Sequence, residues 1–152
     1  MTVQTYTLTE MKRILTTVLL LLLLSGCSSG VKIEANEHSF LIGFRNNCDC
    51  EIYKVHHEYY IGDEPIGGGY ACNADGSAIR SGDVMLKDFI PADFPEGANL
   101  AEFRTEVFVV DGVGKEYPCG ESLNLDAAYG KEFEFTLTGN YDSGFGATWS
   151  EK

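Results

Sequence analysis

The chain of 152 residues has few positive charges: 11 lysines and arginines stand against 23 aspartates and glutamates, and the net charge is −12 with neutral histidines. From residue 27 onward it is more acidic still, with 22 acidic and 9 basic side chains. Such a balance repels phosphate backbones and anionic head groups. It therefore excludes nucleic acid as a partner. The acids are spread along the chain, and we interpret them as a solvated surface that keeps the protein soluble.

Long apolar and helical segments are also lacking. No stretch after residue 30 places apolar residues at helical spacing over more than two turns. The longest apolar run, residues 14–24, is about half of the roughly 20 residues that a membrane-spanning helix needs. No internal repeat or low-complexity linker divides the chain. These absences exclude a helical protein and a transmembrane helix, and they leave a single domain.

The apolar run nevertheless has the surroundings of a secretory signal. Lys12 and Arg13 precede it, and Leu24-Ser25-Gly26-Cys27 follows it with small residues before a cysteine. This tetrapeptide resembles the lipobox of bacterial lipoproteins. The resemblance implies that residues 1–26 are a signal peptide and that Cys27 carries lipid such as palmitate.

The same resemblance implies a location. Two or more long acyl chains hold a protein on a membrane, because each buried methylene contributes about 0.8 kcal/mol. Residues 27–30 then form the lipidated cysteine and a short tether, and residues 31–152 form the domain. Ser28, in place of aspartate, resembles the outer-membrane pattern of enteric-type bacteria. We therefore expect an extracytoplasmic protein of the cell envelope, on the periplasmic or surface face of the outer membrane. Met11 is a candidate for the true start.

The remaining cysteines suggest disulfides, because such a protein lies in an oxidising compartment. Cys48, Cys50, Cys72 and Cys119 are an even set. A bridge between Cys48 and Cys50 would close a small strained ring. We therefore predict two disulfides, in which Cys48 and Cys50 pair with Cys72 and Cys119 in either order.

The periodicity of the chain after residue 30 is that of strands. Apolar and polar residues alternate over residues 39–45, 52–61, 102–109 and 132–138, with weaker candidates at 79–80, 84–89, 115–119, 123–125 and 145–149. Turn signals separate these candidates, and Asp111-Gly112 is typical of a hairpin turn. Gly67-Gly68-Gly69 indicates a loop or a bulge. Residues 91–97 contain two prolines and should cross between sheets.

These patterns predict an all-β fold, an antiparallel β-sandwich of seven to nine strands. The segment from Asp126 to Tyr129 resembles the tyrosine corner of immunoglobulin-like sandwiches, with one residue fewer between aspartate and tyrosine. The resemblance implies an immunoglobulin-like general shape.

Few residues are available for catalysis or metal binding. Cys48, Cys50 and either His56 or His57 could bind copper or zinc, although neighbouring histidines on a strand point to opposite faces. An envelope hydrolase would need a serine beside His57, and no nucleophile-elbow motif is present. The leading prediction is therefore a protein that is not an enzyme and needs no cofactor. We expect a lipid-anchored binding or structural module of the cell envelope.

Aromatic residues suggest where such a module would bind. Tyr60, Phe108 and Ile52 fall on the polar side of their predicted strands. Such a patch suits an envelope protein or a glycan as partner.

Overall fold

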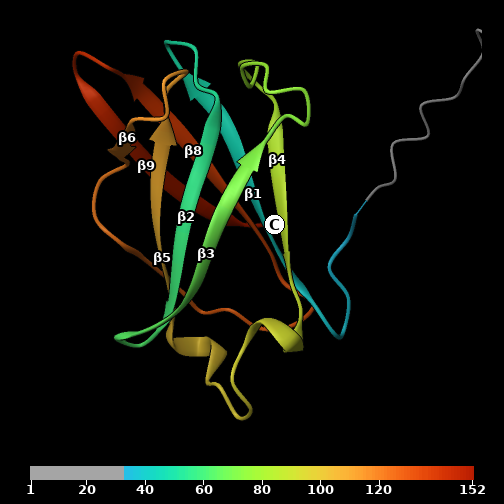
Figure 1. Ribbon diagram of the computed structural model, residues 1–152. Helices are drawn as coiled ribbons and strands as arrows, with labels where there is room; N and C mark the ends of the chain where they lie inside the picture. The colour runs from blue at the N-terminus through green and yellow to red at the C-terminus, as the bar shows by residue number, and fades with distance from the viewer. Residues whose placement is uncertain (1–32) are drawn as a thin grey trace, which may run out of the picture. The chain divides into compact units, whose positions relative to one another are not determined.

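The computed structural model describes residues 33–152, so the signal segment, Cys27 and the tether lie outside the described residues. A compact unit spans Glu34–Lys152 and consists of nine strands in two sheets (Figure 1). The strands are β1 Phe40–Cys48, β2 Lys54–Ile61, β3 Glu64–Cys72, β4 Val84–Phe89, β5 Phe103–Val110, β6 Glu116–Pro118, β7 Leu123–Leu125, β8 Glu132–Asn140 and β9 Gly144–Glu151. The prediction of an all-β sandwich is confirmed.

One sheet has the order β4-β1-β8-β9 and the other β3-β2-β5-β6, with β7 also paired to β5. The segment between β4 and β5 carries the chain from one sheet to the other, as its prolines predicted, and contains the short 3-10 helices Pro91–Asp93 and Leu100–Glu102. One expectation was wrong, because β1 runs parallel to β8 along the ladder from Leu41 to Cys48. Alternation alone does not distinguish the two directions of pairing.

The core between the sheets is dominated by phenylalanine. Phe40 at the start of β1 is fully buried. Its ring lies 4.8 Å from that of Phe89 and 5.3 Å from that of Phe103, between centroids. Phe133 and Tyr129 complete its surroundings at 6.4 and 6.5 Å. Tyr129 is therefore half-buried against the core, and the carboxylate of Asp126 accepts from Lys131.

Strand β3 was not predicted from the sequence, because its three successive glycines break the alternation of apolar and polar residues. Gly67 to Gly69 lie inside it, next to a bulge where the register with β2 shifts between Tyr59 and Tyr60. A Cβ atom on Gly67 would lie 2.7 Å from the Tyr59 hydroxyl, and one on Gly69 would lie 3.6 Å from His57 Nε2. The glycines therefore leave room for the long side chains of β2 to lie against the backbone of β3.

The two ends of the sandwich differ. The chain enters at the end where β1 and β8 begin, and the backbone amide of Ala35 donates to Glu132 there. The segments 49–53, 111–115 and 140–143 lie at the opposite end (Figure 1). Strands of eight or nine residues separate these ends by about 30 Å.

Gly139 in β8 provides a test of this packing. Its φ is +102°, and a Cβ atom would lie 2.1 Å from the carbonyl oxygen of Gly144. We expect Gly139→Ala to lower the free energy of unfolding by about 3 kcal/mol or more, measured by denaturant titration. Gly76→Ala is the matched control, because its φ of +73° has no atom within 4 Å and only the backbone strain remains, about 1–2 kcal/mol. Equal losses for the two variants would contradict the steric explanation.

Candidate binding face

The outer face of the five-stranded sheet carries a row of stacked rings. His56 of β2 lies between Tyr70 of β3 and Phe108 of β5, its partners in the two ladders. The centroid distances are 4.6 and 5.3 Å, with interplanar angles of 21° and 27°. Pro118 of β6 is the next ladder partner of Phe108. We call Tyr70, His56, Phe108 and Pro118 the aromatic row. Tyr70 keeps 56% of its surface exposed, so the row is open to solvent.

Carboxylates fix this row in place. Glu116 accepts a hydrogen bond from the Tyr70 hydroxyl at 2.8 Å, and its other oxygen lies 3.2 Å from His56 Nδ1. The tyrosine hydrogen bond and the nearby histidine lower the pKa of Glu116. The same hydrogen bond raises the pKa of Tyr70. The row is therefore ordered by the protein itself.

The neighbouring positions along the strands hold more charge. Glu58 and Glu106 are directly opposite each other in the β2–β5 ladder. Tyr60 donates to Glu58 at 2.9 Å, and Arg104 binds Glu106 at 2.8 Å. The Arg104 guanidinium also lies 3.9 Å above the centre of the Tyr60 ring. Glu58 also has an oxygen 4.0 Å from His56 Nε2. Both carboxylates therefore have polar partners on the same face.

Two shallow hollows flank these residues. One, of about 350 Å³, is lined by His56, Glu58 and Tyr60 together with the segment 65–68 of β3, where glycines leave the floor open. The other, of about 440 Å³, lies beside Phe108 and is lined also by Glu106, Pro118 and Ser122. The face therefore has open space on both sides of the aromatic row.

The sequence predicted part of this face. Tyr60 and Phe108 lie on it as their register indicated. Ile52 does not, because it precedes β2, is fully buried and bridges to Ile79. Tyr70 was missed with the rest of β3, although the cross-strand position opposite His56 would have identified it once the strand was known.

His56 and His57 point to opposite sides of β2, as predicted. His57 faces the core, is 3% exposed and stacks on Phe44 with 5.5 Å between centroids. Burial, together with the positive charge of Lys87, lowers its pKa to about 4. Its Nδ1 atom has no hydrogen-bond partner among residues 33–152. The serine that a hydrolase would need beside His57 is therefore not in hydrogen-bond contact with that atom.

The predicted copper or zinc site is not formed. Cys48 ends β1 in one sheet, whereas His56 lies on the outer face of the other sheet. His57 contacts Phe44, which is four residues, about 13 Å, before Cys48 on β1. Across the described part of the chain, no three histidine, cysteine, aspartate or glutamate side chains are grouped to hold a metal ion.

The prediction of two disulfides is not supported either, because Cys48, Cys50, Cys72 and Cys119 are all free thiols. Cys48 and Cys119 are buried, and burial raises the pKa of their thiols to about 12 and about 11. Cys72 is exposed opposite Lys54, on the outer side of the five-stranded sheet. The backbone of that sheet separates Cys72 from the buried thiols of Cys48 and Cys119. The spacing of the cysteines in the sequence does not reveal this separation.

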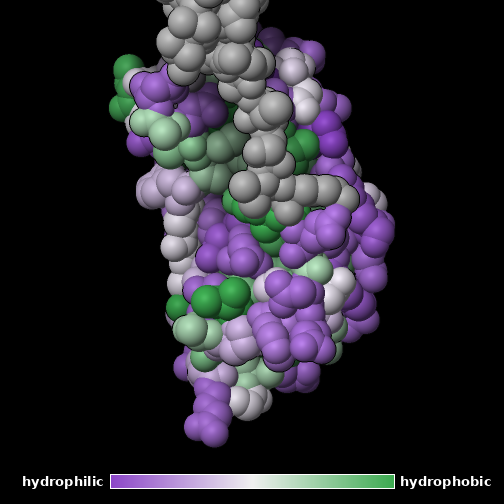
Figure 2. Space-filling view, turned by 90° about the vertical axis from the view of Figure 1, so that its right-hand side faces the viewer, coloured by the Kyte–Doolittle hydropathy of each residue, from purple (hydrophilic) through white to green (hydrophobic). Residues whose placement is uncertain are grey.

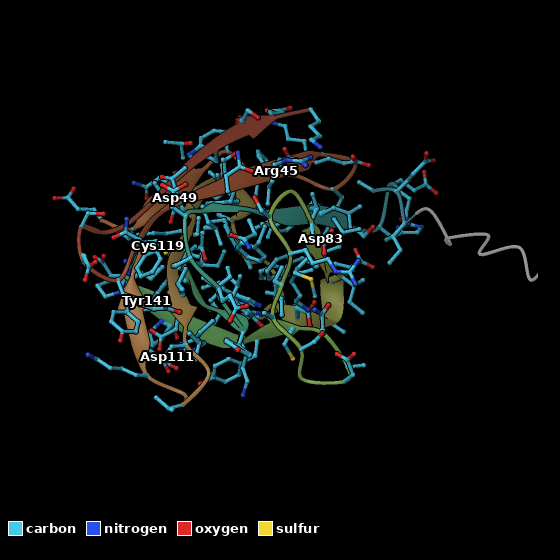
Figure 3. The ribbon with its side chains drawn as sticks, turned by 90° about the horizontal axis from the view of Figure 1, so that it is seen from above. Arg45, Asp49, Asp83, Asp111, Cys119 and Tyr141 are labelled. Atoms are coloured by element: carbon cyan, nitrogen blue, oxygen red, sulfur yellow. The ribbon has the colours of Figure 1, made fainter. Side chains whose placement is uncertain are left out.

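A second aromatic group lies among the loops that join the strands at the end with the segments 49–53, 111–115 and 140–143. Figure 3 labels Tyr141 and Asp111 there. The rings of Tyr117 and Tyr141 are 5.0 Å apart, and Tyr141 donates to the carbonyl oxygen of Glu51 at 2.7 Å. Asp111 accepts from the backbone amides of Val113 and Lys115, as in the hairpin turn predicted there. These hydrogen bonds are made within and between the loops themselves, so we interpret this group as structural.

The comparisons with known proteins concern mainly the N-terminal segment. Residues 11–28 match the model of the prokaryotic membrane lipoprotein lipid attachment site. The chain is a bacterial lipoprotein. The match ends at residue 28, and no curated protein sequence matches the chain. Within residues 33–152, none of the helices has the length and hydropathy to cross a membrane. The attachment site itself implies that the lipoprotein is held at the cell envelope by lipid.

One solved structure is similar to the lipoprotein in part, a putative cell adhesion protein from Bacteroides uniformis ATCC 8492. The identity is 11%, the TM-score is 0.42, and the similar region covers 76% of the lipoprotein. The lipoprotein corresponds to 50% of the length of that chain.

Proposed function

We propose that the lipoprotein is a non-catalytic glycan-binding module, held at the cell envelope by lipid on Cys27, and that it binds through the aromatic row. The observation that carries the proposal is the row itself. Three rings from three strands form a continuous stack on an open sheet face, and hydrogen-bonding carboxylates border it.

The chemistry of a sugar matches this face. A pyranose ring presents a flat face of C–H groups that packs on an aromatic ring, and its hydroxyl groups at the ring edge donate to carboxylates. Tyr70 and Phe108 supply rings at the two sides of His56. Glu58 and Glu106 supply acceptors at the next position along the strands. A chain of sugars can continue into the flanking hollows.

A protein partner suits this face less well. The centres of protein interfaces are depleted in charged residues, whereas Glu58 and Glu106 lie in the middle of this face. Elsewhere, the large exposed apolar residues are isolated, for example Leu86, Val113 and Trp149. Figure 2 views the molecule from the right-hand side of Figure 1, and hydrophobic residues there form small areas among hydrophilic ones.

Several observations support a module without catalysis. Glu58 and Glu106 are each held by a side chain of the same face. His57 is buried in the core and has no partner at Nδ1.

The experiment is glycan-array binding of the full lipoprotein in mild detergent. We expect Tyr70→Ala and Phe108→Ala to weaken the binding of the retained glycans about tenfold each, as the loss of about 1.4 kcal/mol of ring contact would do. Tyr53→Ala is the control, because Tyr53 lies outside the face and its hydroxyl bonds only to Glu51. It should bind as the natural chain does.

Two results would overturn the proposal. Absence of binding to every glycan of the array would remove the binding function. Release of new reducing ends from a bound glycan would show hydrolysis and contradict the non-catalytic assignment.

A further inference from the structure

We infer that the glycan bound by this face carries free amino groups, which are positively charged when protonated. This inference rests on the proposed function and adds the charge of the ligand to it. It follows from three independent features of the face, namely its carboxylates, the positions of its own cations, and the spacing between its rings and its acids.

Carboxylates outnumber cations around the aromatic row. Glu116 contacts the row directly, and Glu58 and Glu106 face each other at the neighbouring ladder position. Arg104 balances only one of them, with its guanidinium 2.8 Å from Glu106. Like charges directly opposite each other on a sheet are destabilising. A cation brought by a ligand would relieve this repulsion.

The cations of the protein itself indicate where a positive group binds here. The Arg104 guanidinium has the Tyr60 ring below it and the Glu106 carboxylate beside it. Lys54 Nζ lies 5.5 Å from the centre of the Tyr70 ring, at the other end of the face. On this face, therefore, cations of the protein already lie over two aromatic rings, and each ring has a carboxylate near its edge. An ammonium group on a sugar can adopt the same arrangement.

The spacing along the strands makes this contact geometrically reachable. Residues on one side of a strand repeat every second position, about 7 Å apart. A sugar ring in contact with the exposed part of Phe108 therefore lies within one such step of Glu106 on the same strand. The partner Glu58 stands at the same step from His56 on β2. An amino substituent at the edge of the ring would extend toward this pair of acids.

The charge of the whole molecule points the same way. At −12 the chain repels uronic-acid and phosphate-bearing polymers over several ångströms, and it attracts polycations. Neutral glycans gain only the ring and hydroxyl contacts. Charge complementarity therefore predicts that amino-bearing glycans bind most tightly, neutral glycans less tightly and anionic glycans least tightly.

The test compares hexamers with matched backbones, measured by calorimetry on the full lipoprotein in detergent. The first is a β-1,4-linked glucosamine hexamer in a buffer that keeps its amines protonated, and the second is its fully N-acetylated form. We expect the amino hexamer to bind at least about tenfold more tightly, with an advantage that falls as salt is added. An oligogalacturonate should not bind.

Variants assign the effect to named residues. The double variant Glu58→Gln and Glu106→Gln should remove the advantage of the amino hexamer over the acetylated hexamer. Binding of the acetylated hexamer should fall much less, because the amide oxygens still accept hydrogen bonds. Tyr70→Ala should weaken both ligands equally. Glu51→Gln, at the far end of the sandwich, is the matched control and should change neither.

The outcomes separate this inference from the function on which it rests. Equal or tighter binding of the acetylated hexamer, or array binding confined to neutral or anionic glycans, would overturn the amino-group inference and leave the glycan-binding function standing. Absence of binding to every glycan would overturn both. Equally tight binding of a lysine-rich peptide, abolished by Tyr70→Ala, would replace the glycan by a cationic protein partner.

Discussion

Replacement of Phe40 by alanine is expected to lower the free energy of unfolding by about 4 kcal/mol, the largest effect of any substitution considered for this protein. Phe40 is fully buried, and its ring contacts come from several strands and from a loop. Its neighbours Phe89 and Phe103 belong to different sheets, so the cavity would open between the two layers. Such a site collapses poorly, because each wall is held by its own ladder of hydrogen bonds.

Denaturant titration of the full chain measures this loss. Phe40→Leu is the conservative variant and should recover more than half of it, because most of the buried volume is kept. Phe108→Ala, which removes the same side chain from the half-buried outer face, should cost about 1–2 kcal/mol. A loss below about 2 kcal/mol for Phe40→Ala would show that the two sheets close over the cavity.

The second large effect is a loss of stability in acid caused by His57. Burial lowers the pKa of His57 to about 4, against 6.5 for an exposed histidine. Between these values the unfolded chain binds a proton that the folded chain does not, so the free energy of unfolding falls as the pH falls. The expected loss relative to pH 7 is about 2 kcal/mol at pH 5 and about 3 kcal/mol at pH 4.

This dependence can be isolated from that of the acids. Glu134, bound by Arg45 and Lys152, has a pKa lowered to about 2, so its contribution is lost only below about pH 4.5. His57→Phe, which keeps a ring beside Phe44, should abolish the slope between pH 6.5 and 5. His56→Phe, on the outer face, should leave that slope in place. A natural chain of constant stability over this range would contradict the assignment to His57.

Strand β3 is the element that local sequence predicts least well. The strand has three successive glycines and little alternation, so local sequence favours a loop. It forms because β2 offers an unpaired edge and because Tyr59 and His57 need a neighbour without side chains. This requirement is visible only once β2 is folded. The residue that completes the aromatic row, Tyr70, was therefore beyond the reach of periodicity.

The cysteines illustrate the same limit. Their even number and the expected compartment favoured two bridges, but a bridge also requires the two Cα atoms to lie close and the two side chains to point toward each other. Cys72 faces outward while Cys48 and Cys119 face inward. The face that each cysteine takes depends on the register of its strand, and β3 was the strand that could not be predicted.

The sequence by itself determined what depends on neighbours along the chain. A charged start, a short apolar run and a lipobox are contiguous signals, and the alternation over 39–45, 52–61, 102–109 and 132–138 is a property of each strand alone. Only the tertiary structure decided which strands are neighbours, that β1 runs parallel to β8, and that His56 stacks between Tyr70 and Phe108. The reason is physical, because pairing between strands far apart in sequence is set by the packing of the whole core.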